Sequence, residues 1–288
     1  MTAINIWDDV DQYAALIQQD TQFVVRETYM LQNLITTFTD MRGGNLRKNY
    51  VYNQMAATAV AESDDLTSST FAGTLGQTLT PAEIGVMAMV SDLRAESMTP
   101  ENTITDVARE LGFAAGDYVE SAIYGDFGSL TGGSLGGTAT AISFTILANA
   151  IALCRFKNKS SSIPLACVMH GYHWNVLAKA ASVAGATVAT APGYIDEITR
   201  TGYVGTFMGV PLYQIYPAQT TGGTAVFAKA AVFPRDALAI DWRRPIRVEG
   251  QRDASMRGAE FTCSAVFAHG IWNPTKGVYI NALAETPS

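Results

Sequence analysis

Charged residues are scarce in this chain of 288 residues. Asp, Glu, Lys and Arg together make up 16% of it, whereas soluble domains usually contain about 25%. Hydrophobic residues reach 48% and the formal net charge is −7. This composition excludes an intrinsically disordered chain, which needs low hydrophobicity together with high net charge. Because a folded monomer needs a hydrated surface, the shortage of charge predicts that other subunits cover much of this one.

Basic residues are not in excess either. The chain has 19 Lys and Arg against 26 Asp and Glu, and its isoelectric point is near 5.0. Domains that bind nucleic acid through a basic patch are usually strongly basic, so that class is excluded. The one basic concentration alternates with Asp241, Glu249 and Asp253 and consists of Arg243, Arg244, Arg247, Arg252 and Arg257. We interpret it as a source of ion pairs between subunits, with contacts to phosphates as the alternative.

No hydrophobic run is long enough to cross a membrane. The most apolar stretch, residues 141–154, is shorter than the roughly 20 residues that a spanning helix needs. The N-terminus is acidic and lacks the apolar core of a signal peptide. Cysteine is rare, and the odd count of Cys154, Cys167 and Cys263 predicts buried thiols in a reducing compartment. We therefore expect a protein made in a cytoplasm without a membrane partner.

Several short strings imitate catalytic or metal-binding motifs without their required context. Residues 132–136 match the nucleophile elbow, but they lie in the glycine-rich tract 125–140, which we interpret as a linker. Residues 126–128 copy the metal-binding triplet of kinases without the other kinase motifs. His170 and His173 are spaced to share one helical face, but zinc needs three or four ligands. We predict no catalytic residue, no metal site, no cofactor and no enzymatic activity.

The first 95 residues carry apolar patterns but no compact domain. One short amphipathic helix is predicted by the helical spacing of Trp7, Val10, Tyr13 and Ile17, and a second by that of Leu31, Leu34, Ile35 and Phe38. Each apolar stripe must lie on another surface, in the same chain or in a neighbour.

Residues 46–95 predict an extended hairpin. Strand-like segments at Tyr50–Tyr52 and Ile84–Val90 flank a polar tip that includes Asp64 and Asp65. An isolated hairpin is at best marginally stable in water. This segment therefore also needs a partner surface.

The rest of the chain predicts an α+β layout. A long amphipathic helix is expected from Thr103, as its N-cap, to about residue 124. Beyond the glycine-rich tract, helical stripes are expected around 144–151 and 174–181, and strands at 164–169, 204–215, 225–233, 247–251, 259–269 and 277–281.

The order of these parts resembles that of the HK97-type major capsid proteins of tailed bacteriophages. Residues 201–213 (TGYVGTFMGVPLY) resemble a recurrent glycine- and proline-containing segment of that family. Residues 229–238 (KAAVFPRDAL) resemble its strand leading into an Asp-Ala turn, and residues 259–281 resemble its last strands.

The resemblance implies an HK97-like capsid fold of the α+β class. It divides the chain into an N-terminal arm (1–45), an E-loop hairpin (46–95), the start of the P-domain with its long spine helix at about 103–124 (96–140), an A-domain (141–222), and the P-domain strands with the C-terminus (223–288).

The function implied by the resemblance is structural. Such a subunit self-assembles as pentamers and hexamers into an icosahedral shell around double-stranded DNA, is found in the virion, and assembles in the cytoplasm of the host bacterium. The short segment before residue 46 predicts that any scaffolding protein is separate. A portal and DNA bound without sequence specificity on the inner face are the other expected partners. The expected assembly contacts are Trp7, Val10, Tyr13, Ile17, Asp64, Asp65, Arg243, Arg244 and Arg247.

Two alternatives stay open from the sequence. An encapsulin-like nanocompartment shell shares the fold and size but encloses a cargo enzyme. An enzyme or binding protein of another α+β fold would instead have a concave site that holds His170, His173 or Ser134.

Overall fold

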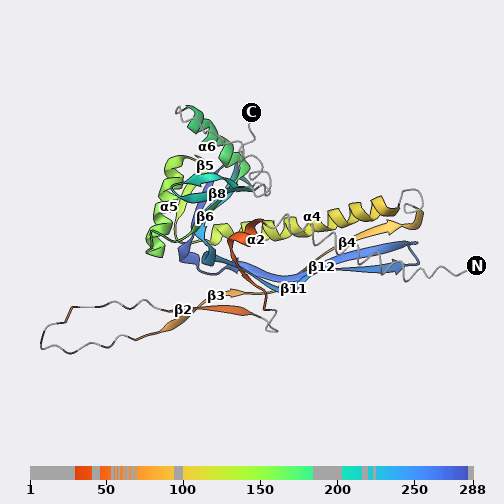
Figure 1. Cartoon of the computed structure of the whole chain (residues 1–288), viewed down its shortest axis with the longest axis horizontal. Coiled ribbons are helices and arrows are strands. Elements are labelled where there is room, and N and C mark those ends of the chain that lie inside the picture. The colour runs from red at the N-terminus through yellow and green to blue at the C-terminus, as the bar shows by residue number, and fades with distance from the viewer. Residues whose placement is uncertain are drawn as a thin grey trace, which may run out of the picture.

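A computed structural model of the chain describes residues 30–40, 46–52, 70–93, 100–183, 203–215, 220–222 and 225–284, with isolated positions between 55 and 68. This part forms a long limb, a compact domain at one end of the limb, and a hairpin that projects beside it (Figure 1).

The limb is a four-stranded sheet with one long helix on its face. The strands, in spatial order, are β1 (Thr36–Phe38), β11 (Leu238–Asp253), β12 (Gly258–Ile271) and β4 (Ala82–Ser91). Strand β1 runs parallel to β11, and the other neighbours are antiparallel. Helix α4 (Pro100–Asp126) lies along this sheet (Figure 1). Its residues Leu111, Ala115, Val119 and Ile123, four apart, are buried against Phe261 and Cys263 of β12.

Helix α4 begins earlier than the sequence predicted. Thr103 was expected as the N-cap, but the first helical residue is Pro100. Proline suits this position because the first turn of a helix has no use for its missing N–H and its backbone angle is already helical. The predicted end near residue 124 is two residues short of Asp126.

The compact domain is built on a seven-stranded sheet. Its main path runs β5 (Ser134–Ala141), β13 (Val278–Leu283), β10 (Ala225–Pro234), β6 (Leu165–His170), β8 (Val210–Ile215) and β7 (Tyr203–Phe207), and β9 (Thr220–Gly222) pairs with β10. The 3-10 turns are η1 (Phe127–Ser129), η2 (Arg235–Ala237) and η3 (Pro274–Lys276).

Both faces of this sheet are buried. Cys167 and Met169 of β6 face a core that contains Leu147 of helix α5 (Phe144–Asn158) and Leu177 of helix α6 (Gly171–Val183). Val168, which points the opposite way, belongs instead to the core beneath α4. The two helices therefore cover one face, and the limb covers the other.

Local signals explain where the elements of this domain begin and turn. The Ser143 side chain caps α5 by accepting a hydrogen bond from the backbone of Ile146, and Lys159 ends it in the left-handed conformation. Met208 and Gly209 both have positive φ between β7 and β8, the geometry of a two-residue hairpin turn. This confirms two strands in the segment 204–215, where the sequence predicted one or two.

The predicted hairpin over residues 46–95 is wrong in its second half. Strand β2 (Arg47–Tyr52) pairs with β3 (Gly73–Leu79), whereas residues 84–90 lie in β4 and pair with β12. Thr80 and Pro81 separate β3 from β4. The alternating apolar residues of β4 join the limb sheet because α4 offers them a core that the hairpin lacks.

Three further expectations are corrected. The second N-terminal helix stops after one turn, α2 (Met30–Leu34), and β1 follows it, because Thr36 and Thr37 are β-branched and find a parallel partner in β11. The tract 125–140 is not a linker: Ser134 opens strand β5, which pairs with β13. Strand β11 also begins at Leu238, well before the predicted residue 247.

Candidate assembly surfaces

The β2–β3 hairpin exposes large apolar side chains that no described part of the chain covers. Tyr50, Tyr52, Phe71 and Leu75 are between 54% and 62% exposed. The rings of Tyr52 and Phe71 stack with their centroids 5.0 Å apart, so they present one continuous surface. Contiguous exposed apolar surface on a soluble domain marks an interaction site.

The base of this hairpin is held rigidly to the limb by ion pairs. Asp241 of β11 is fully buried. Its Oδ2 accepts a hydrogen bond from Nε of Arg47 at 3.0 Å and forms an ion pair with Arg243 at 2.9 Å. Arg47 also pairs with Asp40, and its guanidinium lies 4.2 Å from the ring centroid of Phe38. The direction in which the hairpin projects is therefore fixed by a buried charge.

Further contacts fasten the hairpin next to this ion pair. Asn49 donates from Nδ2 to the carbonyl oxygen of Trp272 at 2.7 Å. Leu79, at the end of β3, is buried with Ala239 and Ala268 of the limb. The apolar surface beyond this base thus stands away from the body on a firm support.

The structure pairs the predicted basic contact residues with carboxylates of the same chain. Besides the Arg243–Asp241 pair, Arg247 lies 2.7 Å from Glu249, and Arg244 pairs with Glu83. Their role between subunits stays a prediction. Asp65 is exposed, whereas Trp7, Val10, Tyr13, Ile17 and Asp64 lie outside the described residues.

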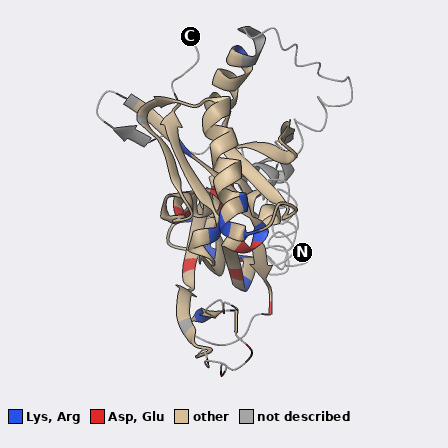
Figure 2. Cartoon of the chain, turned by 90° about the vertical axis from the view of Figure 1, so that its left-hand side faces the viewer, with Lys and Arg blue, Asp and Glu red and all other residues tan. Residues whose placement is uncertain are grey.

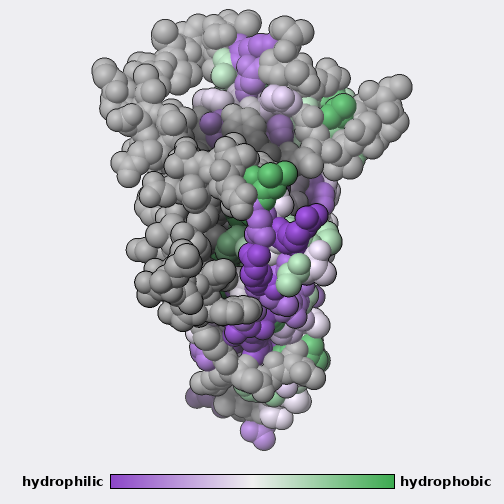
Figure 3. Space-filling view, turned by 90° about the vertical axis from the view of Figure 1, so that its right-hand side faces the viewer, coloured by the Kyte–Doolittle hydropathy of each residue, from purple (hydrophilic) through white to green (hydrophobic). Residues whose placement is uncertain are grey.

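Most of the described surface at the free end of the limb is hydrophilic, and the apolar Leu93 and Met256 are also exposed there. Figure 3 looks onto this end and shows hydrophilic side chains gathered on it. Arg252 donates to both carboxylate oxygens of Asp92, at 3.0 and 2.8 Å, and so joins β11 to the end of β4. This hydrogen bonding lowers the pKa of Asp92 below its ordinary value.

The compact domain carries few charges, as Figure 2 shows, and its two histidines are structural. Their rings lie 6.2 Å apart where β6 passes into α6. His173 is buried with Nε2 3.1 Å from the carbonyl oxygen of Ala282, and burial lowers its pKa to about 4. Burial raises the pKa of the Cys167 thiol to about 12. Across the described ranges, no group of three His, Cys, Asp or Glu side chains is placed to hold a metal ion.

The residues of the motif-like strings 126–128 and 132–136 have structural roles in the fold. Phe127 is fully buried, and Oδ2 of Asp126 lies 2.8 Å from Nδ1 of His269, which joins the end of α4 to β12. Ser134 is exposed at the start of an edge strand rather than on a strand-to-helix turn. No helix among the described residues combines the length and the apolar character needed to span a membrane.

The sequence matches no protein-family model and no curated protein. Solved structures are similar in fold. The chain shares 16% identity and a TM-score of 0.60 with a structure of Mycobacterium phage Che8, over 82% of this chain and 84% of that one. It shares 12% identity and a TM-score of 0.62 with the capsid of Ralstonia phage GP4, over 88% of each chain.

A virus-like particle from Pyrococcus furiosus is similar over 93% of this chain and 99% of its own, with 11% identity and a TM-score of 0.60. These likenesses cover between 82% and 93% of this chain. The chain therefore has the HK97-like capsid fold that the order of its parts predicted.

Proposed function

We propose that the protein is the structural subunit of a closed shell, a major capsid protein that assembles as pentamers and hexamers around double-stranded DNA. One observation carries this proposal: a firmly anchored hairpin projects an apolar surface that its own chain leaves exposed, on a fold shared with capsids over nearly the whole length. A subunit that acted alone would gain nothing from such a hairpin.

The energetics favour many weak contacts. Fully burying a large apolar side chain is worth about 1.5–3 kcal/mol. The rings of Tyr50, Tyr52 and Phe71 are already partly covered, so covering the rest of each is worth roughly 1–2 kcal/mol. Association costs about 4–15 kcal/mol, so one hairpin offsets this cost only partly. A closed symmetric shell repeats the contact around every subunit and so gains stability from interfaces that are individually weak.

In this proposal the segments take the roles that the resemblance implies. Residues 1–45 are the N-terminal arm, 96–140 and 223–288 the P-domain, and 141–222 the A-domain. Within residues 46–95, the E-loop is the β2–β3 hairpin, whereas β4 belongs with the limb. A separate scaffolding protein and a portal are the partners during assembly in the host cytoplasm, and the virion is the final location. The net charge of −7 suits a wall that holds DNA without adhering tightly to it.

A nanocompartment shell that encloses a cargo enzyme is the second candidate. It is favoured by the near-complete overlap with the Pyrococcus furiosus virus-like particle. The two candidates share every surface described above and differ only in what the shell contains.

Assembly of the purified full-length chain tests the proposal. We expect sedimentation and electron microscopy to show closed shells or capsomer rings. A chain that stays monomeric at high concentration would count against both candidates. Shells that copurify with DNA support the capsid, and shells that copurify with one enzyme support the nanocompartment.

A variant pair tests the hairpin surface within this experiment. Tyr52→Ser removes the stacking partner of Phe71 and should abolish or strongly reduce shell formation, whereas Tyr52→Phe keeps the ring and should assemble normally. Both variants should unfold at the same urea concentration as the parent subunit, because Tyr52 lies outside the core. Normal shells from Tyr52→Ser would refute the assigned role of the hairpin.

A further inference from the structure

Charge is divided unevenly between the compact domain and the rest of the chain. The described residues of this domain are 127–183, 203–215, 220–222, 225–237 and 272–284. They include seven Lys and Arg but a single acidic residue, Asp236, so their net charge is +6. Subtracting this from the −7 of the whole chain leaves −13 for the other residues. Surfaces of opposite sign attract each other when they belong to different copies.

The basic side of this division is exposed at the C-terminal end of α5, which Figure 2 shows. Lys157 and Lys159 are exposed there, and Phe156 beside them is 72% exposed. Lys157 forms no ion pair with any residue in the described ranges. These three side chains, Phe156, Lys157 and Lys159, form the α5 surface.

Hydrogen bonds hold the last turn of α5 in place. Arg155 donates from Nη2 to the carbonyl oxygen of Met208 at 2.9 Å, which joins the helix to the turn between β7 and β8. Asn158 donates from Nδ2 to the carbonyl oxygen of Lys276 at 3.0 Å, which joins it to η3. The backbone that carries the α5 surface is therefore preorganised, which lowers the entropic cost of binding.

The solvent side of α4 carries the opposite charge. This helix contains six acidic residues and one basic residue. Glu110, Phe113 and Asp117 are exposed, and their spacing of three and four residues places them on one face. The ring of Phe113, which is 54% exposed, thus lies between two carboxylates. Within the described part of the chain, neither carboxylate forms an ion pair. We call these three residues the α4 surface.

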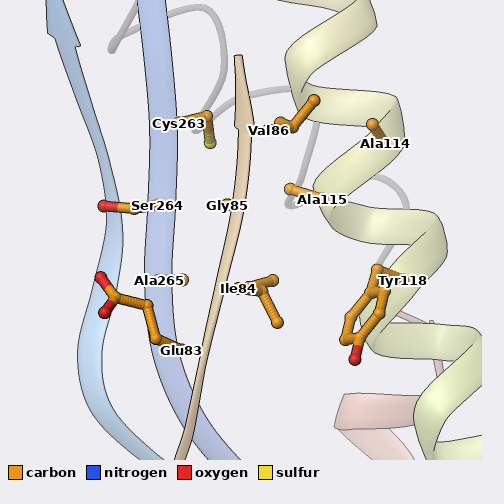
Figure 4. A pocket seen from close by; sticks show the side chains of 10 residues that line it. All are labelled: Glu83, Ile84, Gly85, Val86, Ala114, Ala115, Tyr118, Cys263, Ser264 and Ala265. Atoms are coloured by element: carbon orange, nitrogen blue, oxygen red, sulfur yellow. The ribbon is translucent and has the colours of Figure 1, made fainter.

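The flank of this helix next to the α4 surface is open. A groove of about 400 Å³ lies between α4 and β4, where Ala114 and Tyr118 of the helix face Ile84 and Val86 of the strand (Figure 4). Tyr118 is 54% exposed. Exposed apolar surface therefore continues from Phe113 around the helix into the groove, and no described element covers it. A second chain can approach α4 from this side.

We propose that the α5 surface of one copy docks on the α4 surface of a second copy. The two surfaces are complementary because each presents an exposed ring flanked by charges of a single sign. In the contact Phe156 packs on Phe113, while the lysines lie against the carboxylates. Charge orients the partners and speeds their encounter, and the rings supply buried apolar area.

This contact is heterologous, because the two surfaces differ. Each copy uses its α5 surface on one neighbour and its α4 surface on another, which is how rings and continuous lattices are built. The inference rests on the proposed function, since it requires assembly of many copies. It names a contact separate from that of the β2–β3 hairpin.

Zero-length cross-linking tests the contact. The full-length chain is prepared as isotopically heavy and light populations, mixed, and treated before and after assembly with a carbodiimide, which joins an amine to a carboxylate that touches it. We expect mass spectrometry to find Lys157 or Lys159 linked to Glu110 or Asp117 in mixed heavy–light pairs. Absence of these links in both states, or links only within one chain, would overturn the proposal.

Charge reversal provides the second measurement. The α5 surface is reversed by Lys157→Glu with Lys159→Glu, and the α4 surface by Glu110→Lys with Asp117→Lys. Reversing either surface alone should slow association, followed by light scattering at low salt, by about tenfold or more. Reversing both in one chain should restore most of the rate, which also shows that the variants fold. Lys179→Glu, an exposed position on α6, should associate like the parent.

Each contrary result has a separate meaning. Single-surface variants that associate at the parent rate, or a doubly reversed chain that does not recover, would contradict the pairing of these two surfaces. Protection of Lys157 from acetylation only when DNA is present, without a link to α4, would assign the α5 surface to phosphates instead. Interchain links in a chain that forms no shells would leave this contact standing and count against the proposed function, and shells without the links would do the reverse.

Discussion

At the scale of single residues, Asp241 carries more of the structure than any other charge described. It is fully buried, forms ion pairs with both Arg47 and Arg243, and so joins the hairpin to the limb. Sequence inspection noted Asp241 among the acidic residues that alternate with the basic concentration but gave no reason to pair it with Arg47. The pair depends on a contact between residues 194 positions apart, for which the sequence contains no local signal.

Replacing Asp241 should therefore be costly. Asp241→Ala leaves two guanidinium groups facing each other without their shared carboxylate, and breaking a buried pair in this way costs about 3–5 kcal/mol. Asp241→Asn keeps an acceptor oxygen and should cost less. Urea unfolding of the unassembled subunit measures both variants, and equal stability of Asp241→Ala and the parent would contradict the assigned role.

His173 should make the compact domain sensitive to acid. Burial lowers its pKa to about 4 in the folded state, whereas an unfolded chain has the ordinary value of about 6.5. As the pH falls, His173 therefore takes up a proton in the unfolded state before it does so in the folded state. The free energy of unfolding keeps its full value above about pH 6.5 and decreases as the pH drops toward 4. The total loss is about 3 kcal/mol.

Urea midpoints measured between about pH 7 and pH 4 check this expectation. His173→Asn retains a polar group beside the carbonyl of Ala282 and removes the titration, so its midpoint should vary less over the same range. An unchanged pH dependence in His173→Asn would assign the acid sensitivity to other groups.

At the scale of elements, the edge strand β5 shows how a glycine-rich tract can be ordered by its partner. Gly136 has a φ of +80°, and a side chain there would collide with the backbone of Asn281 on β13. The tract contains glycine because the two strands approach closely and not because the chain must be flexible. Composition alone could not separate these readings, since both predict the same residues.

A matched pair of substitutions distinguishes them. Gly136→Ala should destabilise the compact domain by more than about 1 kcal/mol, because it adds a strained backbone to a steric clash. Gly137→Ala has ordinary backbone geometry and meets only the hydroxyl of Thr140, so its unfolding free energy should stay close to that of the parent. Equal unfolding free energies of Gly136→Ala and Gly137→Ala would contradict the close approach of the two strands and favour the linker interpretation.

The strands of the limb show a second effect of partners on elements. Periodicity correctly indicated β-structure in residues 84–90, but it assigned them to the hairpin. Ile84, Val86 and Ala88 are half-buried and Val90 is buried because α4 lies across that face. Periodicity in the sequence indicates which side chains are buried, but only the tertiary structure shows which element packs against them.

At the scale of the whole molecule, the N-terminal arm is expected to join subunits. Deleting residues 1–20 removes the apolar stripe at residues 7–17. Shell formation should fail or drop sharply, while the urea midpoint of the subunit stays the same. Sedimentation of the deleted chain measures this, and shells identical to those of the full chain would refute the role of the arm.

The shortage of charge, the single long amphipathic helix and the order of the segments follow from the sequence, because composition and periodicity depend on near neighbours in the chain. These features determined the α+β class and predicted a subunit covered by others. Only the tertiary structure decided which strands belong to the hairpin and which to the limb, the burial of the charge at Asp241 and the ordering of β5. Each depends on residues far apart in the sequence meeting at one place, and the pattern of either partner alone does not specify the other.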